Sequence, residues 1–123
     1  MLLLKRAYEP AAPGDGFRVL VDRLWPRGLS KERAKLGEWL KAIAPSEDLR
    51  KWFAHDASRF DAFRERYERE LAEGEAKAAL DTLAARAKKE TVTLVYAAHD
   101  EEHNNAVVLA ALIARRRKRA TAK

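Results

Sequence analysis

Three short segments carry the apolar patterns of β-strands. Residues 2–6 are short and apolar, residues 17–23 have apolar side chains at every second position, and residues 91–98 are β-branched, apolar and bounded by charge. These patterns are typical of strands in a packed sheet. Leu20 adds apolar surface on the opposite side of the second segment, so we expect that strand to be covered on both faces.

Five other segments carry apolar residues three or four positions apart behind a capping or breaking residue, which predicts helices. These segments run from Ser30 toward Ala42, from Ser46 through Phe53, from Ala57 or Ser58 to Leu71, from Ala76 to Ala87, and from Asp100 to Ile113.

The order of these segments predicts the fold class. Strands separated by helices indicate an α/β domain with a small, mainly parallel sheet of about three or more strands and helices packed around it. A chain of 123 residues is the usual size of one domain. We therefore expect a single α/β domain over residues 1–114, followed by a basic C-terminal tail over residues 115–123.

Composition excludes several classes of protein. The chain has no cysteine, so a disulfide scaffold, a thiol nucleophile and a thiolate zinc site are excluded. No segment approaches the roughly 20 apolar residues of a membrane-spanning helix, and no secretory signal is recognisable. We therefore expect a cytoplasmic protein without a membrane partner; the oligomeric state stays open.

The net charge of +6 is concentrated at one end of the chain. Residues 115–123 hold six basic residues and no acidic one, while the rest of the chain is balanced. Such a tail can bind nucleic acid weakly and nonspecifically through phosphate contacts. The favoured interpretation is a solvated helix end, where cations complement the helix dipole.

Polar residues follow the second and the last predicted strands. In a parallel sheet the ligand crevice lies beyond the carboxyl ends of the strands, so these two segments should converge there. In the first, Arg23 and Arg27 suit a carboxylate or phosphate, Trp25 can form an apolar wall, and Asp22 is a candidate catalytic carboxylate. The alternative is structural, with Asp22 paired to an arginine and Trp25 in the core.

The second segment, residues 99–105, is the densest polar run in the chain. It has the H-x-x-E-H spacing of some zinc proteases, but residues 104–123 contain no His, Asp or Glu that could complete a site, so we predict neither metal nor cofactor. His103 is the candidate general acid or base, or else a histidine bound to a carboxylate. The candidate ligand-binding residues here are Asp100, Glu102, Asn104 and Asn105.

Two further features bear on the site. Glu101 and Glu102 are expected in the first turn of the last helix, which argues against a phosphate at that helix end. His55 and Asp56 are also candidate ligand-binding residues, because an Asp beside a His can orient its imidazole. More often such an Asp caps the following helix, and that interpretation is favoured.

Three strings in this chain resemble the YeaO-like proteins, also grouped as domain of unknown function 488. The strings are VLVDRLWPRGL at residues 19–29, LRKWF at 49–53 followed by His55 and Asp56, and LVYAA at 94–98 followed by DEEHNNA at 100–106. The resemblance implies a compact α/β domain of bacterial or archaeal type, and it supplies no reaction. It also implies a set of pattern residues: Asp22, Arg23, Trp25, Arg27, His55, Asp56, Glu102, His103 and Asn104. His99 and Ala57 depart from the usual pattern, and the tail after Ala114 is expected to lie outside the resemblance.

The leading hypothesis is a site at the strand ends that binds, or acts on, a small polar or anionic molecule. The alternative is a nucleic-acid-binding or transcription-regulatory module that uses the basic tail. A third interpretation is that these motifs are mostly structural, with Trp25, Trp39 and Trp52 in the core and the charged residues in buried ion pairs. Whether any reaction is catalysed stays open at this point.

Overall fold

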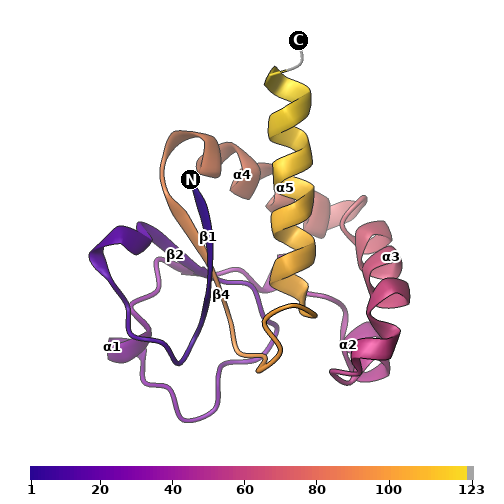
Figure 1. Ribbon diagram of the computed structural model, residues 1–123, viewed down its shortest axis with the longest axis horizontal. Helices are drawn as coiled ribbons and strands as arrows, with labels where there is room; N and C mark the ends of the chain where they lie inside the picture. Colours follow the sequence, from indigo (N-terminus) through magenta and orange to yellow (C-terminus); the bar gives the residue numbers. More distant parts are fainter. Residues whose placement is uncertain (122–123) are drawn as a thin grey trace.

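The computed structural model describes the backbone of residues 1–121 and the side chains of residues 1–116. Its strands are β1 (Leu2–Arg6), β2 (Phe17–Leu20), β3 (Glu38–Trp39) and β4 (Val92–Tyr96), all parallel, in the order β1-β4-β2-β3 (Figure 1). The predicted α/β class with a mainly parallel sheet is therefore confirmed.

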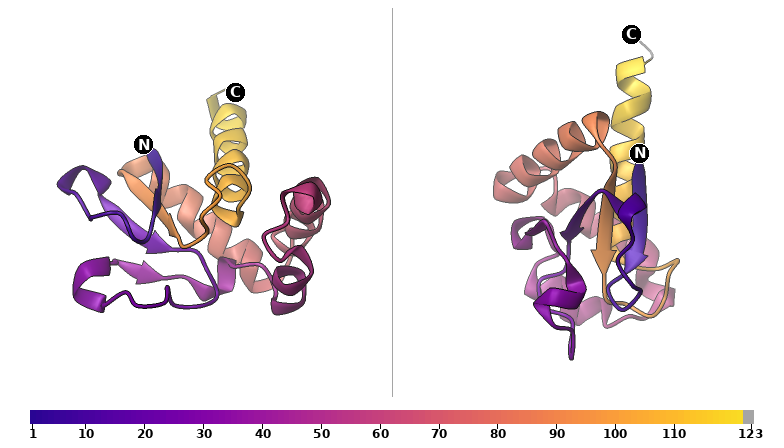
Figure 2. Two further views of the ribbon diagram at one scale, coloured as in Figure 1. Left: turned by 60° about the horizontal axis from the view of Figure 1, so that its bottom comes forward. Right: turned by 90° about the vertical axis from the view of Figure 1, so that its left-hand side faces the viewer.

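The helices follow the strands in the chain. They are α1 (Lys31–Ala34), α2 (Glu47–Phe53), α3 (Phe60–Glu70), α4 (Gly74–Lys89) and α5 (Asn105–Thr121), with short 3-10 turns at Pro13–Asp15, Lys41–Ile43 and Ala57–Arg59. The right-hand view of Figure 2 shows α5 running along β1 and β4, against which it packs. None of the helices in this part of the chain is long and apolar enough to cross a membrane.

Different elements pack against the two faces of the sheet. Alternate residues of β2 and β4 form a core with the helices: Val19, Val21, Val92, Leu94 and Tyr96 pack with apolar side chains of α2, α3, α4 and α5. The opposite face carries Leu20 and Val95, which the segment from Trp25 to Trp39 covers. The two tryptophan rings meet edge to face, with centroids 5.4 Å apart. As expected, the second strand is covered on both sides.

The predicted helix caps at Ser30 and Ser46 are confirmed. The Ser30 hydroxyl accepts a hydrogen bond from the Arg33 amide, and the Ser46 hydroxyl accepts one from the Leu49 amide, each at 3.2 Å. These bonds satisfy amides at the first turns of α1 and α2.

The prediction of a helix from Ser30 toward Ala42 is wrong beyond Ala34. Lys35 has a left-handed backbone (φ 46°), and the chain then pairs with β2 through hydrogen bonds from the Gly37 and Leu40 amides. A Cβ on Gly37 would lie 2.3 Å from the ring of Phe17, so only glycine fits this approach. The chain here forms the short strand β3 in place of helix.

The start of the last helix also differs from the prediction. The helix begins at Asn105, and its cap is Asn104, whose side-chain oxygen accepts from the Val107 amide at 3.0 Å. The Asp100 carboxylate instead accepts from the amides of Glu102 and His103 at 2.9 and 3.0 Å, which forms a turn before the helix. The expectation that acidic residues occupy the first turn of this helix is therefore wrong.

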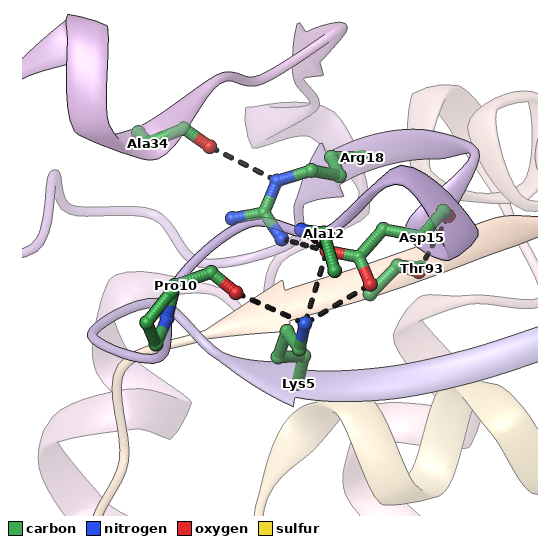
Figure 3. Close-up of polar contacts among 7 residues, drawn as sticks. All are labelled: Lys5, Pro10, Ala12, Asp15, Arg18, Ala34 and Thr93. Carbon is green, nitrogen blue, oxygen red and sulfur yellow. Dashed lines mark hydrogen bonds and ion pairs between the residues drawn. The ribbon is translucent and has the colours of Figure 1, made fainter.

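A buried polar cluster ties the N-terminal loop to the strands (Figure 3). Asp15 accepts from Arg18 at 2.7 Å, from Lys5 at 3.0 and 3.1 Å and from the Ala12 amide at 3.0 Å. Burial would raise the pKa of Asp15, but these hydrogen bonds outweigh it and lower the pKa below its usual value. The Thr93 hydroxyl donates to the Asp15 carbonyl, so the cluster joins β1, β2 and β4.

Candidate functional site

A cavity of about 670 Å³ opens where β2 and β4 end. Both segments that were predicted to converge beyond the carboxyl ends of the strands line this cavity. The candidates found in its lining are Asp22, Arg23, Trp25, Arg27, His55, Asp100, Asn104 and Asn105. Asp56, Glu102 and His103 are not among the lining residues.

Asp22 joins three elements at the base of this cavity. One carboxylate oxygen accepts from the Ala97 amide, just after β4, at 2.9 Å, and the other accepts from the Asn105 side chain at 3.2 Å. Asn105 also donates to the Val21 carbonyl at 2.9 Å, so the ends of β2, β4 and α5 meet here. Burial raises the pKa of Asp22 above its usual value, partly offset by these donors and by the nearby His55.

Arg23 reaches from the end of β2 to the start of α2. Its Nε donates to the Pro45 carbonyl at 3.0 Å, and one terminal nitrogen lies 3.4 Å from the Ala44 carbonyl. No carboxylate oxygen of the described residues lies within 4.0 Å of its guanidinium. The side chain is thus fixed in direction by carbonyls, and its charge has no protein counter-ion in contact.

Arg50, from α2, lines the same cavity, and sequence reasoning missed it. Its Nε is buried and has no hydrogen-bond partner among the described residues. Lys51 is the main cause of the lowered pKa of Glu47, and Arg50 and Arg23 both add to the effect. Arg23 and Arg50 thus both line the cavity, Arg23 from the end of β2 and Arg50 from α2. The one signal for Arg50 in the sequence was its place in the LRKWF string.

Arg27 is exposed and also lines the cavity. Its backbone carbonyl accepts from the Tyr8 hydroxyl at 2.9 Å, while its guanidinium has no ion pair within the described part of the chain. Nearby, a terminal nitrogen of Arg6 lies 3.2 Å from Nδ1 of His99, which also lines the cavity.

His55 comes to the cavity through an unusual backbone. Ala54 and His55 are both left-handed, with φ of 47° and 58°. Such residues each cost roughly 1 kcal/mol and are found where the surrounding structure holds them in place. His55 has no hydrogen bond in the described structure, and its ring lies 6.3 Å from that of Phe53. Asp56 accepts from the amide and hydroxyl of Ser58 at 3.0 and 2.7 Å, as a cap.

His103 lies in the turn before α5 and does not line the cavity. Its Nδ1 is 2.9 Å from the Asp100 carboxylate, and its ring meets the Phe60 ring edge to face with centroids 5.2 Å apart. Hydrogen bonds from the Glu102 amide and His103 lower the pKa of Asp100. Asn104 is buried, donates to the Asp100 carbonyl at 2.9 Å and caps α5. The contacts of Asp100, His103 and Asn104 thus stabilise the turn before α5. Glu102, in the same turn, is exposed to solvent.

The remaining wall of the cavity is apolar. The Trp25 indole donates to the Leu29 carbonyl at 2.6 Å, which leaves its ring as a fixed surface. Apolar lining residues come from both loops and from α2 and α3: Leu24, Trp25, Pro26, Pro45, Phe53, Phe63, Ala97 and Ala98. The site thus combines arginine side chains with apolar walls.

Comparison with known proteins identifies the family. A model described as the inactive DUF488-N3 subclade matches residues 1–123. The chain belongs to this DUF488 subclade.

Relatives in two groups of bacteria agree with that assignment. The chain is 49% identical over 94 residues to the uncharacterized protein YeaO of Escherichia coli K12, which is 76% of this chain and 80% of YeaO. It is 47% identical over 88 residues to the uncharacterized protein Rv3073c of Mycobacterium tuberculosis H37Rv, which is 72% of this chain and 75% of Rv3073c. No solved structure matches the chain. The resemblance to YeaO-like DUF488 proteins is thereby confirmed.

The basic tail is part of the DUF488 match, so the expectation that it lies outside the resemblance is wrong. Its backbone continues α5 as far as Thr121, and its side chains from residue 117 onward lie outside the described residues. Arg115 lies 3.6 Å from the Glu68 carboxylate, and Arg116 forms an ion pair with Asp81. Two of the six tail cations therefore pair with α3 and α4.

Metal binding has no support in the described part of this DUF488 domain. It holds no group of three or more His, Asp or Glu side chains with the geometry to bind a metal ion. The polar side chains that line the cavity are those of Tyr8, Asp22, Arg23, Arg27, Arg50, His55, His99, Asp100, Asn104 and Asn105.

Proposed function

We propose that this DUF488 domain binds a small anionic molecule in the strand-end cavity and does not transform it. The observation that carries the proposal is the set of three arginines, Arg23, Arg27 and Arg50, that line one cavity without an ion-pair partner in the described residues. Guanidinium groups bind carboxylate and phosphate through paired, charge-assisted hydrogen bonds.

Arg50 distinguishes this cavity from an ordinary basic surface. A buried donor without an acceptor costs about 1–3 kcal/mol, so such groups are rare unless a water, ion or ligand satisfies them. The Nε of Arg50 is such a donor, within a side chain that lines the cavity. An anion held there would supply the acceptor that the protein lacks.

The contacts of Asp22 and His103, the two candidate catalytic residues, support binding without reaction. Asp22 already accepts two hydrogen bonds, from the Ala97 amide and Asn105, and His103 does not line the cavity. The subclade to which the chain belongs is itself described as inactive. We therefore assign Asp22 a positioning role and leave His103 out of the ligand contacts.

Titration with inorganic phosphate at constant ionic strength tests the proposal. We expect phosphate to raise the Tm of the parent protein and to show saturable binding by calorimetry. Arg50→Met should weaken binding at least about tenfold, since loss of one charge-assisted hydrogen bond costs about 1.5–3 kcal/mol.

The matched control is Arg69→Met. Arg69 is an exposed arginine of α3 outside the cavity, so its replacement removes the same charge from the protein and should leave phosphate binding unchanged. Equal loss of binding in both variants would mean that phosphate senses only net charge, and the proposal would be wrong.

A further inference from the structure

The cavity is much larger than a bare anion needs. Its volume of about 670 Å³ lies in the range of roughly 300–1,000 Å³ that is typical of sites for whole small molecules. An inorganic ion bound to Arg23 and Arg50 would leave most of this space and its apolar walls to water. The occupant should therefore have an apolar body as well as a charged group.

Exposed apolar side chains gather at this cavity. Among the described residues, the large hydrophobic side chains that are exposed are Met1, Leu4, Tyr8 and Leu24. Tyr8 and Leu24 both line the cavity, and Leu24 is 57% exposed. Single exposed apolar residues are ordinary, but a grouping at the mouth of a cavity indicates a surface that a ligand covers.

The donors of the cavity fit a group with several acceptor oxygens. Arg50 and Arg27 use none of their guanidinium donors on the described residues, and Arg23 uses its donors only on carbonyls. A carboxylate offers two oxygens and one negative charge. A phosphate monoester offers three terminal oxygens and a charge near −2 above its second pKa of about 6, which better matches the two guanidinium groups of Arg23 and Arg50.

The carboxylates of the cavity do not compete for these arginines. Asp22 accepts from Ala97 and Asn105, and Asp100 accepts from two amides and lies beside the His103 ring. Each carboxylate thus has its own donors at the strand ends and in the turn. Neither of these two carboxylates forms an ion pair with an arginine of the cavity within the described part of the chain.

We infer that the ligand is a phosphate monoester of an apolar or aromatic alcohol, with its phosphate at Arg23 and Arg50 and its body against the Leu24, Trp25 and Pro26 wall. This inference rests on the proposed function, because it specifies the anion that the same cavity binds. It adds two separable claims: the charged group is a phosphate, and the rest of the molecule contributes to binding.

Three probes at pH 8 and constant ionic strength test the two claims by calorimetry. Methyl phosphate carries the charged group alone, phenyl phosphate adds an aromatic body, and benzenesulfonate keeps the body with a single negative charge. We expect phenyl phosphate to bind at least about tenfold more tightly than methyl phosphate, because burial of a ring contributes more than about 1.4 kcal/mol. We expect it to bind more tightly than benzenesulfonate as well, because at this pH the phosphate carries a charge near −2.

Variants assign the effect to the wall and to the arginines. Leu24→Ala should weaken phenyl phosphate several-fold and leave methyl phosphate unchanged, whereas Leu4→Ala, at an exposed leucine outside the cavity, should change neither. Arg50→Lys, which keeps the charge but loses the planar fork, should weaken both phosphates.

Each result has a definite meaning. Equal affinities for methyl and phenyl phosphate would refute the apolar body, and equal affinities for phenyl phosphate and benzenesulfonate would refute the phosphate; both outcomes leave anion binding intact. If no probe binds in a manner that depends on Arg50, the inference and the proposed function are both wrong.

Discussion

The replacement of Arg50 by Met separates a ligand-binding arginine from a structural one. Methionine keeps an unbranched apolar stem of similar length and removes the guanidinium. In the free protein this deletes the buried Nε that has no partner in the described structure. A buried donor without an acceptor costs about 1–3 kcal/mol. Because some of that cost is relieved by water, we expect Arg50→Met to raise the free energy of unfolding by about 1 kcal/mol.

The assay is urea unfolding followed by circular dichroism, with thermal melts beside it. For a domain of this size, 1 kcal/mol corresponds to a rise in Tm of about 4 °C, and the urea m-value should not change. A ligand at ten times its Kd stabilises the folded state by about 1.4 kcal/mol. Arg50→Met, whose Kd is at least about tenfold higher, gains no more than about 0.4 kcal/mol at the same phosphate concentration. Phosphate should therefore remove the stability advantage of Arg50→Met over the parent.

Two results would refute this reasoning. Destabilisation of ligand-free Arg50→Met by more than about 1 kcal/mol would show that the protein itself holds the guanidinium. An unchanged response to phosphate would show that Arg50 does not contact the anion. Arg69→Met should match the parent within about 0.5 kcal/mol, as exposed substitutions usually do.

Three further predictions concern stability, each measured by urea unfolding. Asp22→Ala should lower the free energy of unfolding by about 2 kcal/mol, because the amide of Ala97 loses its charged acceptor; no loss would mean that water replaces the carboxylate. Asp15→Asn should cost about 3 kcal/mol at pH 7. The folded-state pKa of Asp15 is lowered, so its contribution to stability is present above the unfolded value of 3.8 and is lost as the pH falls through the folded value. The difference in stability between parent and variant should therefore shrink as the pH falls below 3.8. Asn104→Ala should cost about 1 kcal/mol, since the Val107 amide loses its cap; a loss below about 0.5 kcal/mol would contradict the assignment of the cap.

Much of the fold could be predicted from apolar patterns, and the exceptions have local causes. The long strand β4 is apolar on both faces, so its pattern was clear. Strand β3 has two residues, too few for any periodicity, and it forms because Gly37 lets the chain approach the ring of Phe17. That contact joins residues twenty positions apart and leaves no local signal.

The candidate site was predictable in position and less so in detail. The segments around Arg23 and Asn105 could be predicted to converge, because the ligand crevice of a parallel sheet lies beyond the carboxyl ends of its strands. This reasoning applies only to residues that follow strands, so it did not predict Arg50, which reaches the cavity from α2. Asp100 and Asn104 are equally good caps by residue type, and only the three-dimensional structure shows that Asn104 begins α5. That difference places His103 in the preceding turn, outside the cavity lining.

The position of Arg50 depends on the hydrogen bonds that begin at Asp22. Asp22 fixes the end of β2 against β4 and α5, and the next residue, Arg23, donates to the Pro45 carbonyl. The following residue, Ser46, caps α2, and its carbonyl accepts from the Arg50 amide at 2.9 Å. Asp22→Ala should therefore weaken phosphate binding as well as stability, although Asp22 itself repels anions. If that variant remains folded and binds phosphate more tightly than the parent, the carboxylate acts only through its charge, and its proposed positioning role is wrong.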